Sequence, residues 1–212
     1  MCGRATLVTA IDSIAEQLGV EPIPIGPPRY NLAPGQPVLV LKEDGLAMLD
    51  WGLKPFWSKK PLIQARAETV GSKLGESFAS RRCLMIVDGF YEWSSAAASH
   101  GKRQPHHVHL PDGRVFCIAA VFEGTSCAVL TTEARGAIAG IHDRMPLVVS
   151  PADRRAWLSG SADDARAVLG HTPRADFELA PVSMRVNDVK NDDPSCLAAA
   201  GSDPGQIALP FR

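Results

Sequence analysis

The chain has 212 residues, 45% of them hydrophobic, so one large or two small domains with a real core are expected. Its 22 basic and 23 acidic residues give a net charge of −1, which excludes a general attraction to nucleic acid but leaves room for a local basic surface. No stretch approaches the roughly 20 apolar residues of a membrane span, and no signal segment opens the chain, so we expect a cytoplasmic protein. Five cysteines without CxxC spacing predict reduced thiols.

Apolar periodicity and turn residues predict mostly β structure with a few short helices. Glu43-Asp44-Gly45 and Pro111-Asp112-Gly113 each predict the turn of a hairpin, and Ser150 before Pro151 predicts a helix N-cap. The predicted elements are helices over 9–19, 150–158 and 161–170, and strands over 38–41, 46–51, 83–87, 106–110, 115–121, 127–131 and 147–149. They predict an α+β, β-rich single domain over 1–212, with mostly antiparallel sheets, an open barrel-like core and short flanking helices. The polar tail after about residue 192 is expected to be loosely ordered.

Cys2 directly follows Met1, and methionine aminopeptidases usually accept a side chain of that size. Removal of Met1 would place an α-amine and a thiol on one residue, and both groups titrate only slightly above neutral pH. The thiolate can attack a carbonyl with the amine as its base. Alternatively, both groups can condense with one aldehyde, first as a Schiff base and then as a five-membered thiazolidine. An ordinary buried cysteine in second position remains open from this residue alone.

Two further side chains are suited to proton transfer. Glu92 lies at the predicted end of the apolar strand 83–87, where a carboxylate between two aromatic residues is partly desolvated. His142 lies in a polar turn before the strand 147–149, and histidine both donates and accepts a proton near neutral pH. The alternatives are a carboxylate that faces water and a structural loop histidine.

One segment, 54–82, is locally basic. Its cations outnumber its two acids, Glu68 and Glu76, and predict a groove for a single strand, although a solvated loop has the same composition. These cations are Lys54, Lys59, Lys60, Arg66, Lys73, Arg81 and Arg82. His107 and His109 would share one strand face, but no acidic or cysteine partner stands at ligand spacing, so neither a metal nor another cofactor is expected.

Several sequence blocks occur along the chain in a specific order. They are 2–4 (CGR), 29–35 (RYNLAPG), 51–57 (WGLKPFW), 65–69 (ARAET), 88–93 (DGFYEW), 141–146 (IHDRMP) and, more weakly, 181–192. In this order they resemble the SOS-response-associated peptidase (SRAP) family, the abasic-site-processing proteins. The blocks run from residue 2 to residue 192, so the resemblance covers nearly the whole chain.

The resemblance implies a role in the DNA damage response. In the family, the N-terminal cysteine captures the ring-opened aldehyde of an abasic site in single-stranded DNA as a thiazolidine, which leaves a covalent DNA–protein crosslink. Cys2 matches that cysteine, Glu92 the family's catalytic glutamate and His142 its histidine. A lyase side activity through the Schiff base is also implied. The peptidase name reflects self-removal of residues ahead of the cysteine, and here only Met1 stands ahead, so no general protease activity is expected.

The resemblance also assigns positions around the aldehyde and along the DNA. Family members carry Asn in their active site where this chain has Gln64, so the role passes to a longer and less fixed amide. Arg4 and Arg66 match motif arginines expected to hold phosphates. Lys54, Lys59 and Lys60 are expected to extend this basic track, and Trp57, Trp93 and Pro34 to stack or wedge. Asn31 is expected to fix the loop around Cys2, and Trp51 to pack in the core.

The expected partner is therefore single-stranded DNA that contains abasic sites, bound by a monomer that joins the nucleoid when DNA is damaged. Two other classes remain. An N-terminal-cysteine amidohydrolase or glutamine amidotransferase would also begin Met-Cys-Gly, and glutaminase activity would reveal it. A non-catalytic single-stranded DNA-binding module, disabled at Gln64, would bind without a crosslink.

Overall fold

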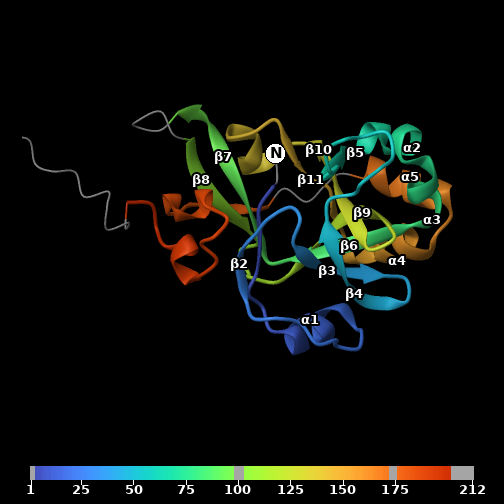
Figure 1. Ribbon diagram of the computed structural model, residues 1–212, viewed down its shortest axis with the longest axis horizontal. Helices are drawn as coiled ribbons and strands as arrows, with labels where there is room; N and C mark the ends of the chain where they lie inside the picture. The colour runs from blue at the N-terminus through green and yellow to red at the C-terminus, as the bar shows by residue number, and fades with distance from the viewer. Residues whose placement is uncertain (1–2, 98–102, 172–175, 202–212) are drawn as a thin grey trace, which may run out of the picture.

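Two β-sheets share one hydrophobic core in the computed structural model, which describes residues 3–97, 103–171 and 176–201 (Figure 1). The first sheet has the strand order β13–β8–β7–β1–β2, and all neighbouring strands in it run antiparallel. Its strands are β1 (Ala5–Leu7), β2 (Arg29–Leu32), β7 (Gly89–Ala97), β8 (Arg103–His109) and β13 (Glu178–Pro181). The strand that begins the chain therefore lies inside this sheet, between β7 and β2.

The second sheet has the order β11–β10–β4–β3–β6–β9–β12, with β5 beside β10. Because β9 also pairs with β10, the sheet closes on itself like a ring. Its pairings are antiparallel except those of β10 with β4 and β5. Its strands are β3 (Pro37–Lys42), β4 (Gly45–Trp51), β5 (Gln64–Arg66), β6 (Arg82–Val87), β9 (Phe116–Glu123), β10 (Ser126–Glu133), β11 (Arg144–Pro146) and β12 (Val148–Val149). The predicted β-rich, mostly antiparallel fold is confirmed.

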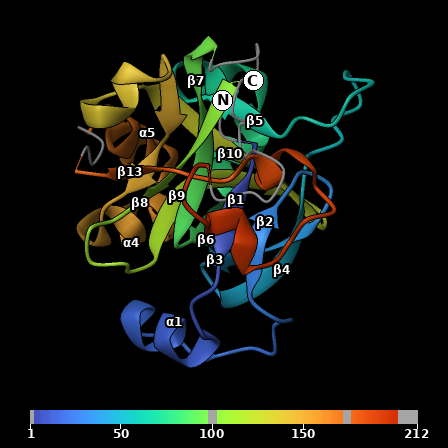
Figure 2. The same cartoon turned by 90° about the vertical axis from the view of Figure 1, so that its left-hand side faces the viewer.

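The helices are short and lie outside the sheets. Helices α2 to α5 gather on one side of the second sheet, and α1 lies apart from them at the lower edge of the molecule (Figures 1 and 2). The α-helices are α1 (Ile11–Leu18), α2 (Val70–Lys73), α3 (Gly75–Ser80), α4 (Arg154–Ser159) and α5 (Ala162–Gly170). The 3₁₀ helices are η1 (Ala67–Thr69), η3 (Gly136–Gly140), η4 (Pro151–Asp153), η5 (Met184–Asn187) and η6 (Pro194–Leu197).

Local signals in the sequence explain where several helices begin and end. Gly19 ends α1 in the left-handed region, with φ of 69°, which glycine adopts without a steric penalty. Ser161 begins α5 with a capping box, in which Ser161 and Asp164 bond each other's backbone N–H groups. Ser150 accepts a hydrogen bond from the Asp153 backbone N–H and begins η4, which leads into α4. The predicted helices and the β3–β4 hairpin are confirmed.

The predicted placement of Glu92 at the end of the strand 83–87 is wrong. β6 ends at Val87, and the chain crosses at Asp88 into β7 of the other sheet, so Glu92 lies within β7. Asp88 fixes this crossing because its carboxylate accepts hydrogen bonds from the Thr6 hydroxyl at 2.6 Å and the Val8 backbone N–H at 2.6 Å. Gly89 has no room for a side chain, since a Cβ there would lie 2.0 Å from His107 Nε2.

The hairpin predicted from 106–110 and 115–121 is also wrong. β8 pairs with β7 and β13 in the first sheet, whereas β9 pairs with β6, β10 and β12 in the second. The connection passes between the sheets with Leu110 and Val115 buried in the shared core. β9 pairs with the apolar strand β6, and it therefore does not pair with β8.

The polar tail was expected to be loosely ordered after about residue 192, but the structure shows packed residues as far as 201. Residues 193–201 include η6, which Asp193 caps and in which Cys196 is fully buried. This segment lies beside β2 and β7, in red at the left of Figure 1. Residues 202–212 lie outside the described part of the chain. No helix in the described ranges is long and apolar enough to cross a membrane.

Candidate active site

Glu92 and His142 come together from different parts of the fold. Glu92 lies on β7 with a side chain only 2% exposed, and His142 precedes β11 with a side chain 18% exposed. His142 Nε2 lies 3.9 Å from Glu92 Oε1. A nearly buried carboxylate beside an imidazole forms a pair in which one group can hold a proton while the other gives one up. The structure thus joins two of the predicted catalytic residues.

The other ring nitrogen of His142 faces both a donor and an acceptor. The Arg144 backbone N–H donates to Nδ1 at 2.9 Å, and Asp143 Oδ1 lies 2.9 Å from the same atom. Nδ1 accepts the bond from the Arg144 N–H when it carries no proton, and it donates to the Asp143 carboxylate when it carries one. The bond from Arg144 thus favours the neutral tautomer with its proton on Nε2, the nitrogen nearest Glu92.

Strand pairing holds Arg4 and β1 beside β7, the strand that carries Glu92. In the β1–β7 register Ala5 faces Phe90, and the Tyr91 backbone N–H donates to the Arg4 carbonyl at 3.0 Å. Each antiparallel step back along β1 corresponds to a step forward along β7, so the chain runs from Arg4 towards Glu92. The candidate nucleophile Cys2, like Met1, lies outside the described residues.

Arg4 donates its hydrogen bonds within the protein. Its Nη1 donates to Asn31 Oδ1 at 2.9 Å and to the Val186 carbonyl at 2.6 Å. Burial lowers the pKa of Arg4, against the opposing effect of nearby Asp188. The guanidinium is thereby tied to the chain's C-terminal part.

Asn31 is fully buried and also binds that C-terminal part, residues 186–192, here named the C-terminal strap. Its Nδ2 donates to the carbonyls of Val186, Asp188 and Asn191 at 3.2, 3.0 and 2.7 Å. Asp192 completes the attachment by accepting bonds from the Tyr30 and Asn31 backbone N–H groups at 2.6 and 2.8 Å. The Asn31 side chain thus donates to backbone carbonyls of the C-terminal strap, whereas the prediction placed its bonds in the loop around Cys2.

Gln64 lies on β5, next to an exposed groove. In the parallel pairing of β5 with β10, Gln64 faces Val129. A groove of about 490 Å³ connects Gln64 with Trp57, Arg66 and Lys73. Trp57 is 50% exposed, and the cations at 66 and 73 are also exposed, so this groove offers an aromatic face and positive charge beside the predicted catalytic amide.

The basic segment 54–82 divides into two parts. Lys54, Lys59 and Lys60 are exposed on the loop that carries Trp57, as a track for phosphates requires. Arg82, by contrast, is buried and donates to backbone carbonyls of Phe78, Ala79, Trp157 and Gly160. Its contribution to a basic groove is thus excluded, and it instead joins α3 to α4.

The remaining predicted aromatic and wedge residues have different surroundings. Trp93 is half-buried, and its indole N–H donates to Asn187 Oδ1 at 2.7 Å. Pro34 is half-buried in the turn after β2. Trp51 is fully buried, as expected of a core residue, and donates to the Ile63 carbonyl at 2.9 Å.

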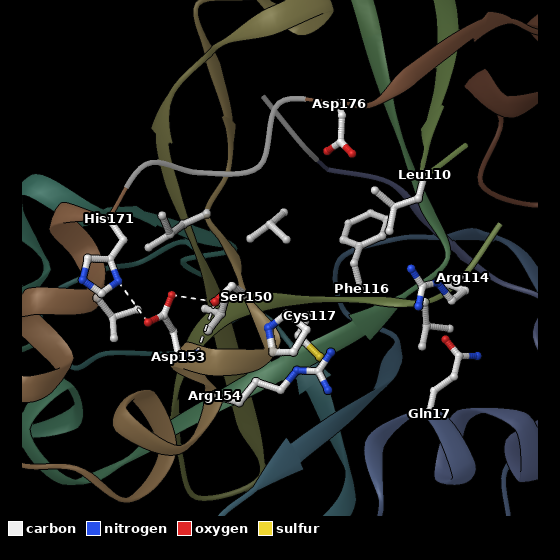
Figure 3. A pocket seen from close by; sticks show the side chains of 16 residues that line it. Gln17, Leu110, Arg114, Phe116, Cys117, Ser150, Asp153, Arg154, His171 and Asp176 are labelled. Carbon is white, nitrogen blue, oxygen red and sulfur yellow. Dashed lines mark hydrogen bonds and ion pairs between the residues drawn. The ribbon is translucent and has the colours of Figure 1, made fainter. Parts of the chain in front are cut away.

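A cavity of about 570 Å³ lies elsewhere, between β9, β12, α4 and α1 (Figure 3). None of the predicted site residues lines it. Two of its polar groups pair with each other, since His171 Nδ1 lies 3.0 Å from Asp153 Oδ1, and Arg114 pairs with Asp112. Glu92 and His142 thus lie outside this cavity.

His107 and His109 were predicted to share one face of a strand. Their rings are stacked, with the ring centroids 5.2 Å apart. Within the described ranges, no group of three His, Cys, Asp or Glu side chains is arranged to hold a metal ion. His107 instead bonds the Thr6 hydroxyl at 3.1 Å, in the network that contains Asp88.

Sequence reasoning gave no role to Glu68, Arg144 or Asp192. Glu68 and Arg144 form a two-bond ion pair at 2.7 and 2.9 Å, close to His142. Each of the three residues lies inside a sequence block that carries the family resemblance. A charged residue within such a block could have been recognised as a candidate for a role in the site. Their partners, however, are 76 and more than 160 residues away along the chain.

A family model described as "SOS response associated peptidase (SRAP)" matches residues 1–189. Abasic site processing protein YedK of Escherichia coli is 34% identical over 218 residues, which cover 90% of this chain and 96% of YedK. Abasic site processing protein YoaM of Bacillus subtilis is 33% identical and covers 94% of this chain and 98% of its own.

Solved structures show the same fold. A phage-related protein from Bordetella bronchiseptica matches with a TM-score of 0.73 and 27% identity, over 86% of this chain and 95% of that one. A protein from Bacteroides thetaiotaomicron matches with a TM-score of 0.79 and 18% identity, over 94% of this chain and all of that one. At 18% identity the second match concerns the fold alone.

Proposed function

The chain belongs to the SOS response associated peptidase family, and from this premise we propose that it processes abasic sites in DNA by covalent capture. After removal of Met1, Cys2 forms a thiazolidine with the open aldehyde of an abasic site in single-stranded DNA. The Glu92–His142 pair, with nitrogen and oxygen 3.9 Å apart, is the observation that carries this proposal. Glu92 lies on β7, the strand that pairs with β1 near the start of the chain, which supports the proposal.

The reaction requires proton transfer at each step. Opening of the sugar removes a proton from its C1 hydroxyl and adds one to the ring oxygen. The Cys2 amine then attacks the aldehyde carbon and the carbinolamine loses water to give a Schiff base. Addition of the thiolate to the same carbon closes the thiazolidine, so one water is released overall. Glu92 and His142 supply and remove these protons, and Gln64 bonds the sugar oxygen.

The exposed groove supports a path for the DNA. Single strands bind where cations follow the backbone and aromatic faces stack on bases. The loop 54–60 supplies exposed lysines and Trp57, and β5 supplies Arg66. These groups contact phosphates and base faces, so we expect recognition of the lesion and the backbone with little base readout.

A denaturing gel shift tests the proposal. Protein whose intact mass confirms loss of Met1 is mixed with single-stranded DNA that carries one abasic site. A heat-stable shifted band is expected, absent with undamaged DNA and with Cys2→Ala. No band from Met1-free protein would refute covalent capture, and retained binding without a band would identify a binding module.

The same reactions separate the other activities. Shortened DNA in place of a shifted band would assign the main product to the lyase route through the Schiff base. Glutaminase activity that depends on Cys2 would favour an amidohydrolase. Peptidase activity is expected only as removal of Met1, so Cys2-dependent turnover of unrelated peptides would contradict this part of the proposal.

A further inference from the structure

We propose that Glu68 and Arg144 form a positioning pair that sets the tautomer of His142. Arg144 Nη1 and Nη2 donate to the two carboxylate oxygens of Glu68 at 2.7 and 2.9 Å. Nη2 also donates to the Thr131 carbonyl at 2.6 Å. The hydrogen bond from Arg144 lowers the pKa of the Glu68 carboxyl, so the pair stays charged. Two parallel bonds fix the guanidinium plane in direction as well as in distance.

The pair joins three neighbouring strands. Glu68 lies in η1 directly after β5, Arg144 begins β11, and Thr131 lies on β10 between them. The Thr131 hydroxyl also bonds the Ala65 carbonyl at 3.4 Å. The backbone of Arg144 is paired with Glu133 of β10, and the ion pair with Glu68 adds a second restraint on Arg144 at the start of β11.

That backbone acts directly on His142. The Arg144 N–H donates to His142 Nδ1 at 2.9 Å, which keeps the proton of the neutral ring on Nε2, towards Glu92. Asp143 Oδ1, also 2.9 Å from Nδ1, favours the opposite tautomer. With Arg144 held by Glu68, the donor stays in place and Nε2 keeps its proton. Without Glu68 only the pairing with β10 holds the donor, and Asp143 competes more strongly for a proton on Nδ1.

An ordinary surface ion pair does not account for these contacts. Exposed pairs contribute little because water screens them and their side chains lose freedom. The Glu68 side chain is 51% exposed, but the Arg144 side chain is only 13% exposed and its acceptor Thr131 is buried. Arg81 and Glu76 form a comparison pair with a 2.7 Å contact, and the Glu76 side chain is 82% exposed.

The test is the tautomer of His142, read from ¹⁵N shifts of histidine-labelled protein at about pH 8.5, where imidazoles are neutral. His142→Gln assigns the signal. The wild type and Glu76→Ala are expected to carry the proton on Nε2, and Glu68→Ala to shift towards Nδ1. Glu68→Gln keeps one acceptor and is expected to lie between them. An unchanged tautomer in folded Glu68→Ala would overturn the proposal.

The importance of this placement for catalysis rests on the proposed function, whereas the tautomer measurement requires no DNA. Crosslinking by Glu68→Ala is expected to be about tenfold slower, because a small displacement of a proton-transfer group has a large effect on rate. Urea unfolding of both variants checks that the fold is retained. A slower rate with an unchanged tautomer would also refute positioning. An altered tautomer in a protein that forms no crosslink at all would refute only the proposed function.

Discussion

At the scale of single residues, Gln64 is the position where the sequence departs from the family pattern. Gln64 is one of the residues that line the groove of Trp57 and Arg66. Gln64→Ala removes a hydrogen bond worth about 1 kcal/mol, so the crosslinking rate should fall about fivefold. Gln64→Asn keeps the amide on a shorter stem and is expected to remain active. Rates from quenched time courses measure both, and a wild-type rate in Gln64→Ala would make the residue structural.

At the scale of elements, the C-terminal strap stabilises the strands that carry the site. Asp192→Ala would leave the Tyr30 and Asn31 backbone N–H groups without their acceptor and break the 2.5 Å contact with Arg29. We expect a loss of about 3 kcal/mol in the free energy of unfolding, measured in urea, since each buried unpaired group costs about 1–3 kcal/mol.

Asp163→Ala is the matched control for the strap. Asp163 pairs with Arg166 on the surface of α5 and its side chain is 91% exposed. Removal of such a pair changes stability by less than about 1 kcal/mol. Equal effects of the two substitutions would show that the strap does not hold β2.

The exposed loop before β5 makes a separate prediction about affinity. Trp57→Ala should weaken binding to undamaged single-stranded DNA about tenfold, because stacking on one base is worth about 1–3 kcal/mol. Trp57→Phe keeps an aromatic face and should lose less. Fluorescence anisotropy measures both, and equal affinity of Trp57→Ala and the wild type would remove Trp57 from the DNA path.

At the scale of the whole molecule, acid should destabilise the fold through His107. Burial, aided by nearby His109, lowers the pKa of His107 from 6.5 to about 4. Between pH 4 and 6.5 the unfolded chain therefore binds more protons than the folded protein. The neutral, buried His107 thus contributes stability that is complete above pH 6.5 and is lost as the pH falls through 4. The full effect is about 3 kcal/mol.

Replacement of His107 tests the predicted direction of this pH dependence of stability. In urea unfolding from pH 7 to 4, His107→Gln should lose less stability than the wild type. His171→Gln, whose side chain is 56% exposed in the native protein, should follow the wild type. Identical pH profiles for all three proteins would contradict the assignment to His107.

The sequence predicted what depends on neighbouring residues and missed what depends on distant ones. Gly19 and Ser161 mark helix boundaries through contacts within one turn, and both boundaries were found. The crossing at Asp88 depends on Thr6 and Val8, about 80 residues away, and was missed. For the candidate site, motif order singled out Glu92 and His142, which the fold brings within 3.9 Å of each other. It did not single out Glu68, whose contact with Arg144 exists only after three strands pair.

The place of β1 has a mechanical consequence. β1 lies between β7 and β2, and Asp88 holds the chain just beyond it. If Cys2 is joined to DNA, a motor that pulls on that DNA applies its force along β1. Two ladders of hydrogen bonds then resist together, in shear, before the strand can slide out. The crosslinked protein should therefore resist forced extraction from its N-terminus more strongly than pulling from its C-terminus.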